Sequence, residues 1–155
     1  MSYRITGLDC EQFAAYFDMD ETALAEHGAV RVVAGTDKGW PCRISLEDAK
    51  AGDELILLNH VSHDVATPYR SAYAIYVRSV ANQKAEYVDE TPPVFEGRPM
   101  AFRGFDADGM LRSAALALPG QADAKIRELF ESQEIAYIHA HNAAHGCFSA
   151  TVERA

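Results

Sequence analysis

The stretch that decides the fold is Ile135-Ala-Tyr-Ile-His-Ala-His-Asn-Ala-Ala-His-Gly-Cys-Phe-Ser-Ala-Thr-Val152. Side chains of a β-strand alternate between its two faces, and residues 142–146 suit a loop that turns the chain back. We therefore expect a hairpin in which Cys147 lies opposite His141 and Ser149 lies opposite His139. Its apolar face would consist of Ala136, Ile138, Ala140, Phe148, Ala150 and Val152. Its polar face would consist of Tyr137, His139, His141, Cys147, Ser149 and Thr151.

A second hairpin signal occurs earlier in the chain. Residues 100–105 and 110–118 flank Asp106-Ala-Asp-Gly109, which is a strong turn sequence. Residues 71–78 are rich in tyrosine and β-branched side chains, which favour a strand. Hairpins outnumber possible β-α-β units, so the sequence predicts an α+β fold with a mainly antiparallel sheet, as a single compact domain over residues 1–155.

The loop of the 100–118 hairpin has two possible lengths. A four-residue loop would place Arg103 opposite Arg112, and directly opposed like charges destabilise a strand pair. A two-residue Asp108-Gly109 turn would instead place Phe105 opposite Arg112. The sequence leaves both registers open.

About three helices are expected. Asp9 followed by Gln12 is a capping-box pattern before a short helix. Asp20 predicts the start of a second helix, which would end near His27. The longest predicted helix spans residues 121–132.

The apolar face of that longest helix predicts how it packs. Ile126, Leu129 and Phe130 share one side of the helix. We expect them to pack on the sheet face that includes Ile138 and Phe148.

Length and charge exclude several classes of protein. A chain of 155 residues can bury a core without a metal or disulfide, and none of the three cysteines has a pairing pattern. The net charge of −9 argues against nucleic acid and against anionic membrane surfaces. Apolar runs such as residues 55–58 are far too short to span a bilayer, and the first residues do not resemble a signal peptide. We expect a cytoplasmic protein with reduced thiols.

Histidine spacing gives a weak metal hypothesis. His139 and His141 lie two apart on one strand face, and His145 follows after three intervening residues. Further ligands would have to come from His60, His63, Asp64 or Cys147. The alternative is that the histidines are solvated or hydrogen-bond their neighbours. No cofactor and no structural metal are predicted.

Cys147 is a candidate nucleophile. A neighbouring histidine can support a thiolate, and Asn142 could orient the ring. The alternative is that Cys147 packs as a small apolar side chain.

Arginines give a second hypothesis, capture of a small anion. Arg70 and Arg78 would share one face of a strand, and Arg43 follows Trp-Pro-Cys. Guanidinium groups bind carboxylate or phosphate in a bidentate fashion. The alternative is that these arginines form ion pairs with some of the 23 acidic residues.

Several short motifs occur in a fixed order along the chain. They are Tyr3-Arg-Ile-Thr-Gly-Leu8, Gly39-Trp-Pro-Cys-Arg-Ile-Ser45, Thr67-Pro-Tyr-Arg-Ser71, Ile75-Tyr-Val-Arg78, His139-Ala-His-Asn-Ala143 and Gly146-Cys-Phe148. With these motifs the chain resembles the bacterial domain of unknown function 1203 family over nearly its whole length. The resemblance implies a small bacterial cytosolic protein and brings no catalytic residues.

Two functional classes follow. The first is a binding domain for a small anionic molecule, which would use Arg43, Arg70, Arg78, His139, His141 and Asn142. The second is a small enzyme acting on a phosphate- or carboxylate-bearing substrate, with His139 and His141 as acid/base groups or metal ligands. No complete catalytic constellation can be assembled, so the binding domain is favoured. The sequence defines neither a substrate nor an oligomeric state.

Overall fold

The computed structural model describes residues 1–155, and its elements are mainly strands. The strands are β1 (Tyr3–Thr6), β2 (Val30–Val33), β3 (Glu54–His63), β4 (Ser71–Arg78), β5 (Glu86–Val88), β6 (Met100–Phe105), β7 (Leu111–Ala117), β8 (Tyr137–Asn142) and β9 (Phe148–Arg154). The helices are α1 (Ala14–Phe17), α2 (Glu21–Glu26) and α3 (Ala122–Phe130), with short 3-10 helices η1 (Cys10–Gln12) and η2 (Pro93–Phe95). The predicted α+β class, with mainly antiparallel sheet and about three helices, is confirmed. None of these helices has the length and hydropathy needed to cross a membrane.

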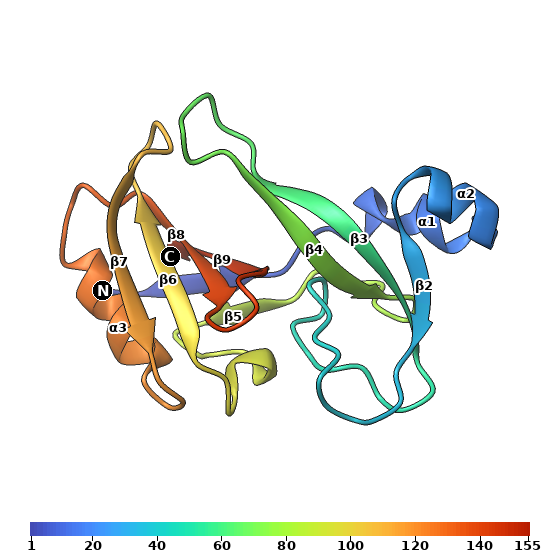
Figure 1. Cartoon of the computed structure of the whole chain (residues 1–155). Coiled ribbons are helices and arrows are strands. Elements are labelled where there is room, and N and C mark those ends of the chain that lie inside the picture. The colour runs from blue at the N-terminus through green and yellow to red at the C-terminus, as the bar shows by residue number, and fades with distance from the viewer.

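The strands form two sheets rather than one (Figure 1). The larger has the order β5-β1-β9-β8-β6-β7, and the smaller has the order β2-β3-β4. Helix α3 lies on the outer side of the larger sheet, whereas α1 and α2 lie beside the smaller sheet (Figure 1). The two sheets therefore face each other at the middle of the molecule, where side chains from both of them meet.

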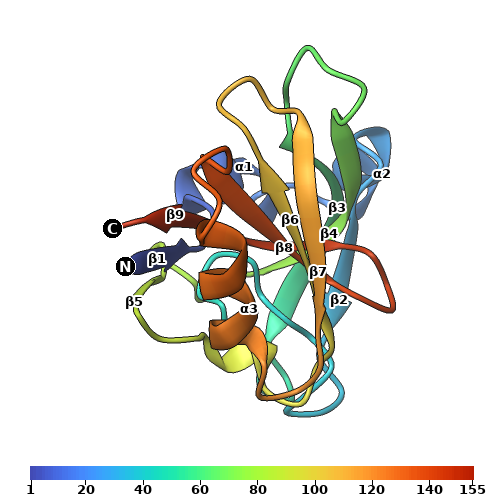
Figure 2. The ribbon, with the colours of Figure 1, turned by 90° about the vertical axis from the view of Figure 1, so that its left-hand side faces the viewer.

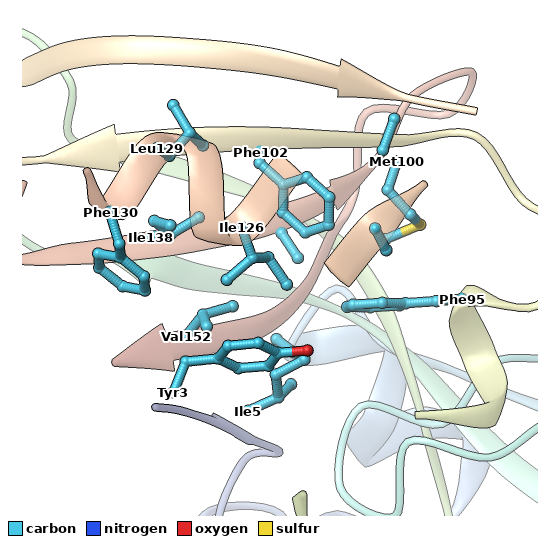
Figure 3. Packing of buried hydrophobic residues seen from close by; sticks show 14 of the residues in the cluster. Tyr3, Ile5, Phe95, Met100, Phe102, Ile126, Leu129, Phe130, Ile138 and Val152 are labelled. Carbon is cyan, nitrogen blue, oxygen red and sulfur yellow. The ribbon is translucent and has the colours of Figure 1, made fainter. Parts of the chain in front are cut away.

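The main core lies between α3 and the six-stranded sheet. Figure 2 shows α3 lying across that sheet, and Figure 3 shows its side chains directed into the cluster. Ile126, Leu129 and Phe130 pack in one buried cluster with Ile138, as the helix periodicity predicted. Burying each such side chain stabilises the fold by about 1.5–3 kcal/mol.

The expected partner Phe148 is not in that cluster, because the predicted register of the β8–β9 hairpin is wrong. His139 lies opposite Thr151, and a register shift then places His141 opposite Phe148. Ser149 is the extra residue of a β-bulge, and a bulge reverses the alternation of faces. The Phe148 ring thus lies on the histidine side, 5.1 Å from the His139 ring centroid.

The β6–β7 hairpin also contains a bulge and matches neither simple register. Arg103 lies opposite Ala114, so it does not face Arg112. Phe105 lies opposite Leu111 instead. Arg112 turns back to Asp106 in the loop, with an Nη2–Oδ2 distance of 2.6 Å.

The two predicted helix caps differ in outcome. The Asp20 side chain accepts a hydrogen bond from the Ala23 backbone N–H at 2.8 Å, as expected of an N-cap. Asp9 makes no such bond, because the chain forms only a 3-10 turn after it. The capping-box prediction at Asp9 is therefore wrong.

The segment between β2 and β3 connects the two sheets. Cys42 pairs with Tyr76 of β4 in a parallel bridge. On its other side, the Leu8 backbone N–H donates to the Arg43 carbonyl at 2.8 Å. Gly7 makes this approach possible, because a Cβ there would lie 2.1 Å from the Ile44 carbonyl oxygen.

We predict that Gly7→Ala destabilises the protein by at least about 2 kcal/mol, because the methyl group collides with backbone that cannot yield. Gly35→Ala is the matched control: its Cβ would meet no atom within 4 Å, and its change should stay within about 0.5 kcal/mol. Urea unfolding of both variants measures the difference. Equal stability of the two variants would contradict the close approach at Gly7.

Candidate functional site

The centre of the candidate site is the buried side chain of Arg43, which is only 1% exposed. Its backbone is held on both sides, since the Arg43 N–H donates to the Tyr76 carbonyl at 3.0 Å and its carbonyl accepts from Leu8. The smaller sheet thus fixes where this side chain starts. From there the guanidinium reaches the β8–β9 hairpin of the larger sheet.

Both hydrogen-bond partners of the guanidinium come from that hairpin. Arg43 Nη1 donates to Ser149 Oγ at 2.9 Å, and Nη2 donates to Cys147 Sγ at 3.2 Å. The buried Nε has no partner. The bulge provides this contact, because Ser149 is the residue that the β8–β9 ladder leaves unpaired.

No acidic side chain balances the charge of Arg43. Each ion pair within 4.0 Å in this molecule involves another cation. Burial lowers the pKa of Arg43, and the nearby Cys147 sulfur partly offsets this effect. Arginine nevertheless stays protonated in proteins, so a buried positive charge remains without a counter-ion.

This guanidinium lines a cavity of about 400 Å³ between the two sheets. Its walls come from the segment before β3, from β3 and β4, from residues 97–99 and from the β8–β9 loop. The lining residues are Gly39, Pro41, Arg43, Leu57, Tyr73, Ala74, Ile75, Tyr76, Gly97, Arg98, Pro99, Asn142, Ala143, Ala144, His145 and Cys147. Half of them are hydrophobic.

A second polar atom at this cavity also lacks a partner. Asn142 is 8% exposed, and its side-chain Oδ1 accepts no hydrogen bond. By contrast, Arg98 in the cavity wall is neutralised by a bidentate contact with Asp48, at 3.0 and 2.7 Å. The cavity lining therefore includes a guanidinium without an acidic partner, Arg43, and a side chain with an unpartnered acceptor, Asn142.

The other arginines named from the sequence lie away from this cavity. Arg70 precedes β4 and is ion-paired with Asp64 at 3.1 Å. Arg78, at the far end of β4, pairs with Glu47 at 2.8 Å and donates to Ser45 Oγ at 3.2 Å. Neither arginine lines the cavity, and both have the acidic partners that Arg43 lacks.

His139 and His141 lie in a buried layer of rings between the two sheets, which we call the histidine layer. Its members are His63, Phe105, Tyr137, His139, His141 and Phe148. The His141 ring is fixed at both nitrogens, because Nδ1–H donates to the Gly146 carbonyl at 3.0 Å and Nε2 accepts from Arg103 at 3.4 Å. His139 Nδ1 is buried without a partner.

These two rings are neutral near pH 7. Burial is the main cause that lowers the pKa of His139 to about 3, and the neighbouring His63 and His141 add to it. Burial also lowers the pKa of His141 to about 4, although the hydrogen bond to Gly146 opposes the shift. No group of three or more His, Cys, Asp or Glu side chains is arranged to hold a metal ion, and His145 is exposed on the loop.

Comparison with known proteins places the chain in a family. Residues 39–154 match the family described as "Protein of unknown function (DUF1203)". The chain belongs to this family. No match was found among curated proteins or among solved structures.

The matched span of this DUF1203 protein includes every residue that lines the cavity, and Ser149. The motif at residues 3–8 lies outside it. The family description assigns no activity, so the function has to be argued from the site itself.

Sequence reasoning grouped Arg43 with Asn142 in one anion-binding set and named Cys147 as a candidate nucleophile, but it did not predict the contact between Arg43 and Cys147. It missed the wall residues Tyr76 and Pro99, which carry no chemical signal in the sequence. Ser149 was expected opposite His139, but it is the unpaired residue of the bulge, and its contact with Arg43 depends on that bulge.

The histidine layer of this DUF1203 protein predicts a loss of stability in mild acid. The folded-state pKa values of His139 and His141 lie below the unfolded value of 6.5, so the unfolded chain binds more protons as the pH falls below 6.5. The free energy of unfolding should therefore decrease from pH 6.5 to about pH 5, with a slope that approaches about 3 kcal/mol per pH unit.

Urea unfolding at several pH values measures this slope. His139→Phe should reduce it by about 1.4 kcal/mol per pH unit, because one titrating ring is removed while His141 and the partly buried His60, whose pKa is also lowered by burial, remain. His145→Gln, which changes an exposed ring, should leave it unaltered. A slope that is the same in all three proteins would show that the buried histidines do not cause it.

Proposed function

We propose that this DUF1203 protein binds a small anionic molecule in the cavity beside Arg43. The observation that carries this proposal is the buried guanidinium with no acidic partner. Removing such a cation from water costs several kcal/mol unless a charge of opposite sign is supplied. A carboxylate or phosphate in the cavity would supply that charge through the N–H groups that Arg43 still has free.

The remaining polar atom adds a second requirement. Asn142 Oδ1 is an acceptor with no donor, and an unsatisfied buried acceptor costs about 1–3 kcal/mol. A ligand that carries a hydroxyl or amine near its anionic group would satisfy it. The favoured ligand is therefore an anion with a hydrogen-bond donor close by.

The volume and lining of the cavity indicate the size and polarity of the rest of the ligand. A volume of about 400 Å³ lies in the range of small-molecule sites, roughly 300–1,000 Å³. Leu57, Ile75 and Pro99 contribute apolar surface to the lining. The ligand would thus combine one anionic end with an apolar body, and the single uncompensated cation favours one negative charge over two.

We further propose that the protein works in the bacterial cytosol. All three cysteines are free thiols, which suits a reducing compartment. The net charge of −9 makes nucleic acid an unfavourable partner.

Thermal unfolding in the presence of benzoate, 2-hydroxybenzoate and inorganic phosphate tests the binding proposal. A ligand at a hundred times its Kd stabilises by about 2.7 kcal/mol, which raises the Tm of a domain this size by about 5–10 °C. We expect the carboxylates to raise the Tm more than phosphate does. Arg43→Gln should abolish the shift, and Arg70→Gln is the matched control that should retain it.

A second variant covers the case that Arg43→Gln does not fold. Ala144 lies exposed on the loop and lines the cavity, so Ala144→Phe should fold normally while reducing the room for a ligand. It should lower the carboxylate shift. The proposal fails if no anion stabilises the native chain, or if Arg70→Gln abolishes the shift and the two cavity variants do not.

A further inference from the structure

We propose that Cys147 is a nucleophile that reacts with an electrophilic carboxylate held by Arg43. The inference rests on the proposed anion site and adds a reaction to it. The substrate class is a small carboxylate that carries a leaving group on the carbon next to its carboxyl group.

The first argument is that sulfur and anion share one guanidinium. Arg43 Nη2 donates to Cys147 Sγ at 3.2 Å, and both residues line the same cavity. A guanidinium has five N–H groups, of which the contacts with Ser149 and Cys147 use two. A carboxylate bound to the remaining N–H groups would lie beside the sulfur. Reaction between two groups held next to each other is effectively unimolecular and therefore faster than a reaction that needs a chance encounter.

The second argument is the electrostatic environment of the sulfur. A cation that donates a hydrogen bond to a cysteine sulfur stabilises negative charge on it, and the thiolate is the reactive form. With no acidic side chain near Arg43, no carboxylate of the protein competes for this cation. The guanidinium is therefore free to act on both the sulfur and the ligand.

An independent observation indicates that a ligand belongs here. Asn142 is more than nine-tenths buried, lines the same cavity and has an unpartnered Oδ1. Burial of a polar atom without a partner is uncommon in folded proteins and calls for a missing donor. A substrate with a donor group would be held at this point as well as at Arg43.

The other two cysteines have different surroundings. Cys42 is completely buried, and its sulfur accepts the Arg78 backbone N–H at 3.4 Å. Cys10 is partly exposed, and its thiol donates to the Asn82 carbonyl at 3.4 Å. Neither lines the cavity, so Cys10 is a natural internal reference for an accessible thiol.

The reaction is a simple displacement. The Cys147 thiolate forms a bond from its sulfur to the carbon next to the carboxyl group. The bond from that carbon to the leaving group breaks, and the leaving group departs with the electron pair. The proton of the thiol is released to solvent, so no oxidant or other reactant is required.

Iodoacetate and iodoacetamide form a matched pair of probes, because both transfer a two-carbon group with loss of iodide and only iodoacetate carries a charge. Rates of alkylation at Cys147 and Cys10 are measured separately by peptide mass spectrometry on the full chain. The ratio of the iodoacetate rate to the iodoacetamide rate should be at least about tenfold higher at Cys147 than at Cys10. Tenfold is the smallest rate increase typical of electrostatic attraction between a charged ligand and its site. This ratio cancels differences in exposure between the two thiols.

Arg43→Gln should reduce the ratio at Cys147 to that at Cys10, and Arg43→Lys should give an intermediate value. If these variants do not fold, an experiment on the native chain replaces them, in which benzoate competes with iodoacetate for the site. Benzoate should then protect Cys147 from iodoacetate and leave Cys10 unprotected.

The outcomes separate the two proposals. Slow alkylation of Cys147 by both reagents, while benzoate still raises the Tm, overturns the nucleophile and leaves the anion site standing. Equal ratios at Cys147 and Cys10, with no protection by benzoate, overturn the delivery of an anion to Cys147. A raised ratio that disappears without Arg43 supports the inference.

Discussion

A buried guanidinium without a counter-ion is the constraint on which this structure depends. Arg43 starts from a segment paired with the smaller sheet, and its side chain ends on Ser149 and Cys147 of the larger sheet. These two neutral groups accept hydrogen bonds from the guanidinium but do not compensate its positive charge. The contact between the two sheets is therefore polar where Arg43 lines the cavity, and the proposed anion site depends on that arrangement.

One irregular residue gives the site its composition. A regular β8–β9 ladder would keep Phe148 on the α3 side, away from the histidines. The bulge at Ser149 instead moves Phe148 into the histidine layer and leaves Ser149 to accept from Arg43. The bulge at Ser149 thus adds the Phe148 ring to the histidine layer and a hydroxyl group to the surroundings of Arg43.

The sequence patterns predicted the strands and the helix that local periodicity of apolar side chains determines. The strands β4, β6, β7, β8 and β9 and the helix α3 all carry clear alternation or helical spacing, and each is present. The patterns could not reveal the bulges, since one extra residue changes no residue type. Strands β1 and β5 have only four and three residues, and their pairing depends on partners far away in the chain.

The candidate site residues divide in the same way, into those that local sequence indicated and those whose position depends on distant contacts. The hairpin indicated Asn142 and Cys147 because their residue types are unusual there. The depth of Arg43 had no such signal, because residues 40–46 form no regular element and their burial is set by contacts with Gly7 and β4. Arg70 and Arg78 share a strand but lie near its opposite ends, each with an acidic partner.

The position of β1 has a consequence for how the chain folds. This strand lies inside the larger sheet, between β5 and β9, and Tyr3 pairs with Arg154. The sheet cannot be completed until β9 has been synthesised. Pairing of such distant segments closes a long loop and slows folding. During that interval the edges of β5 and β9 remain open to other strands, so a newly made chain is most prone to aggregate just before its first strand is paired.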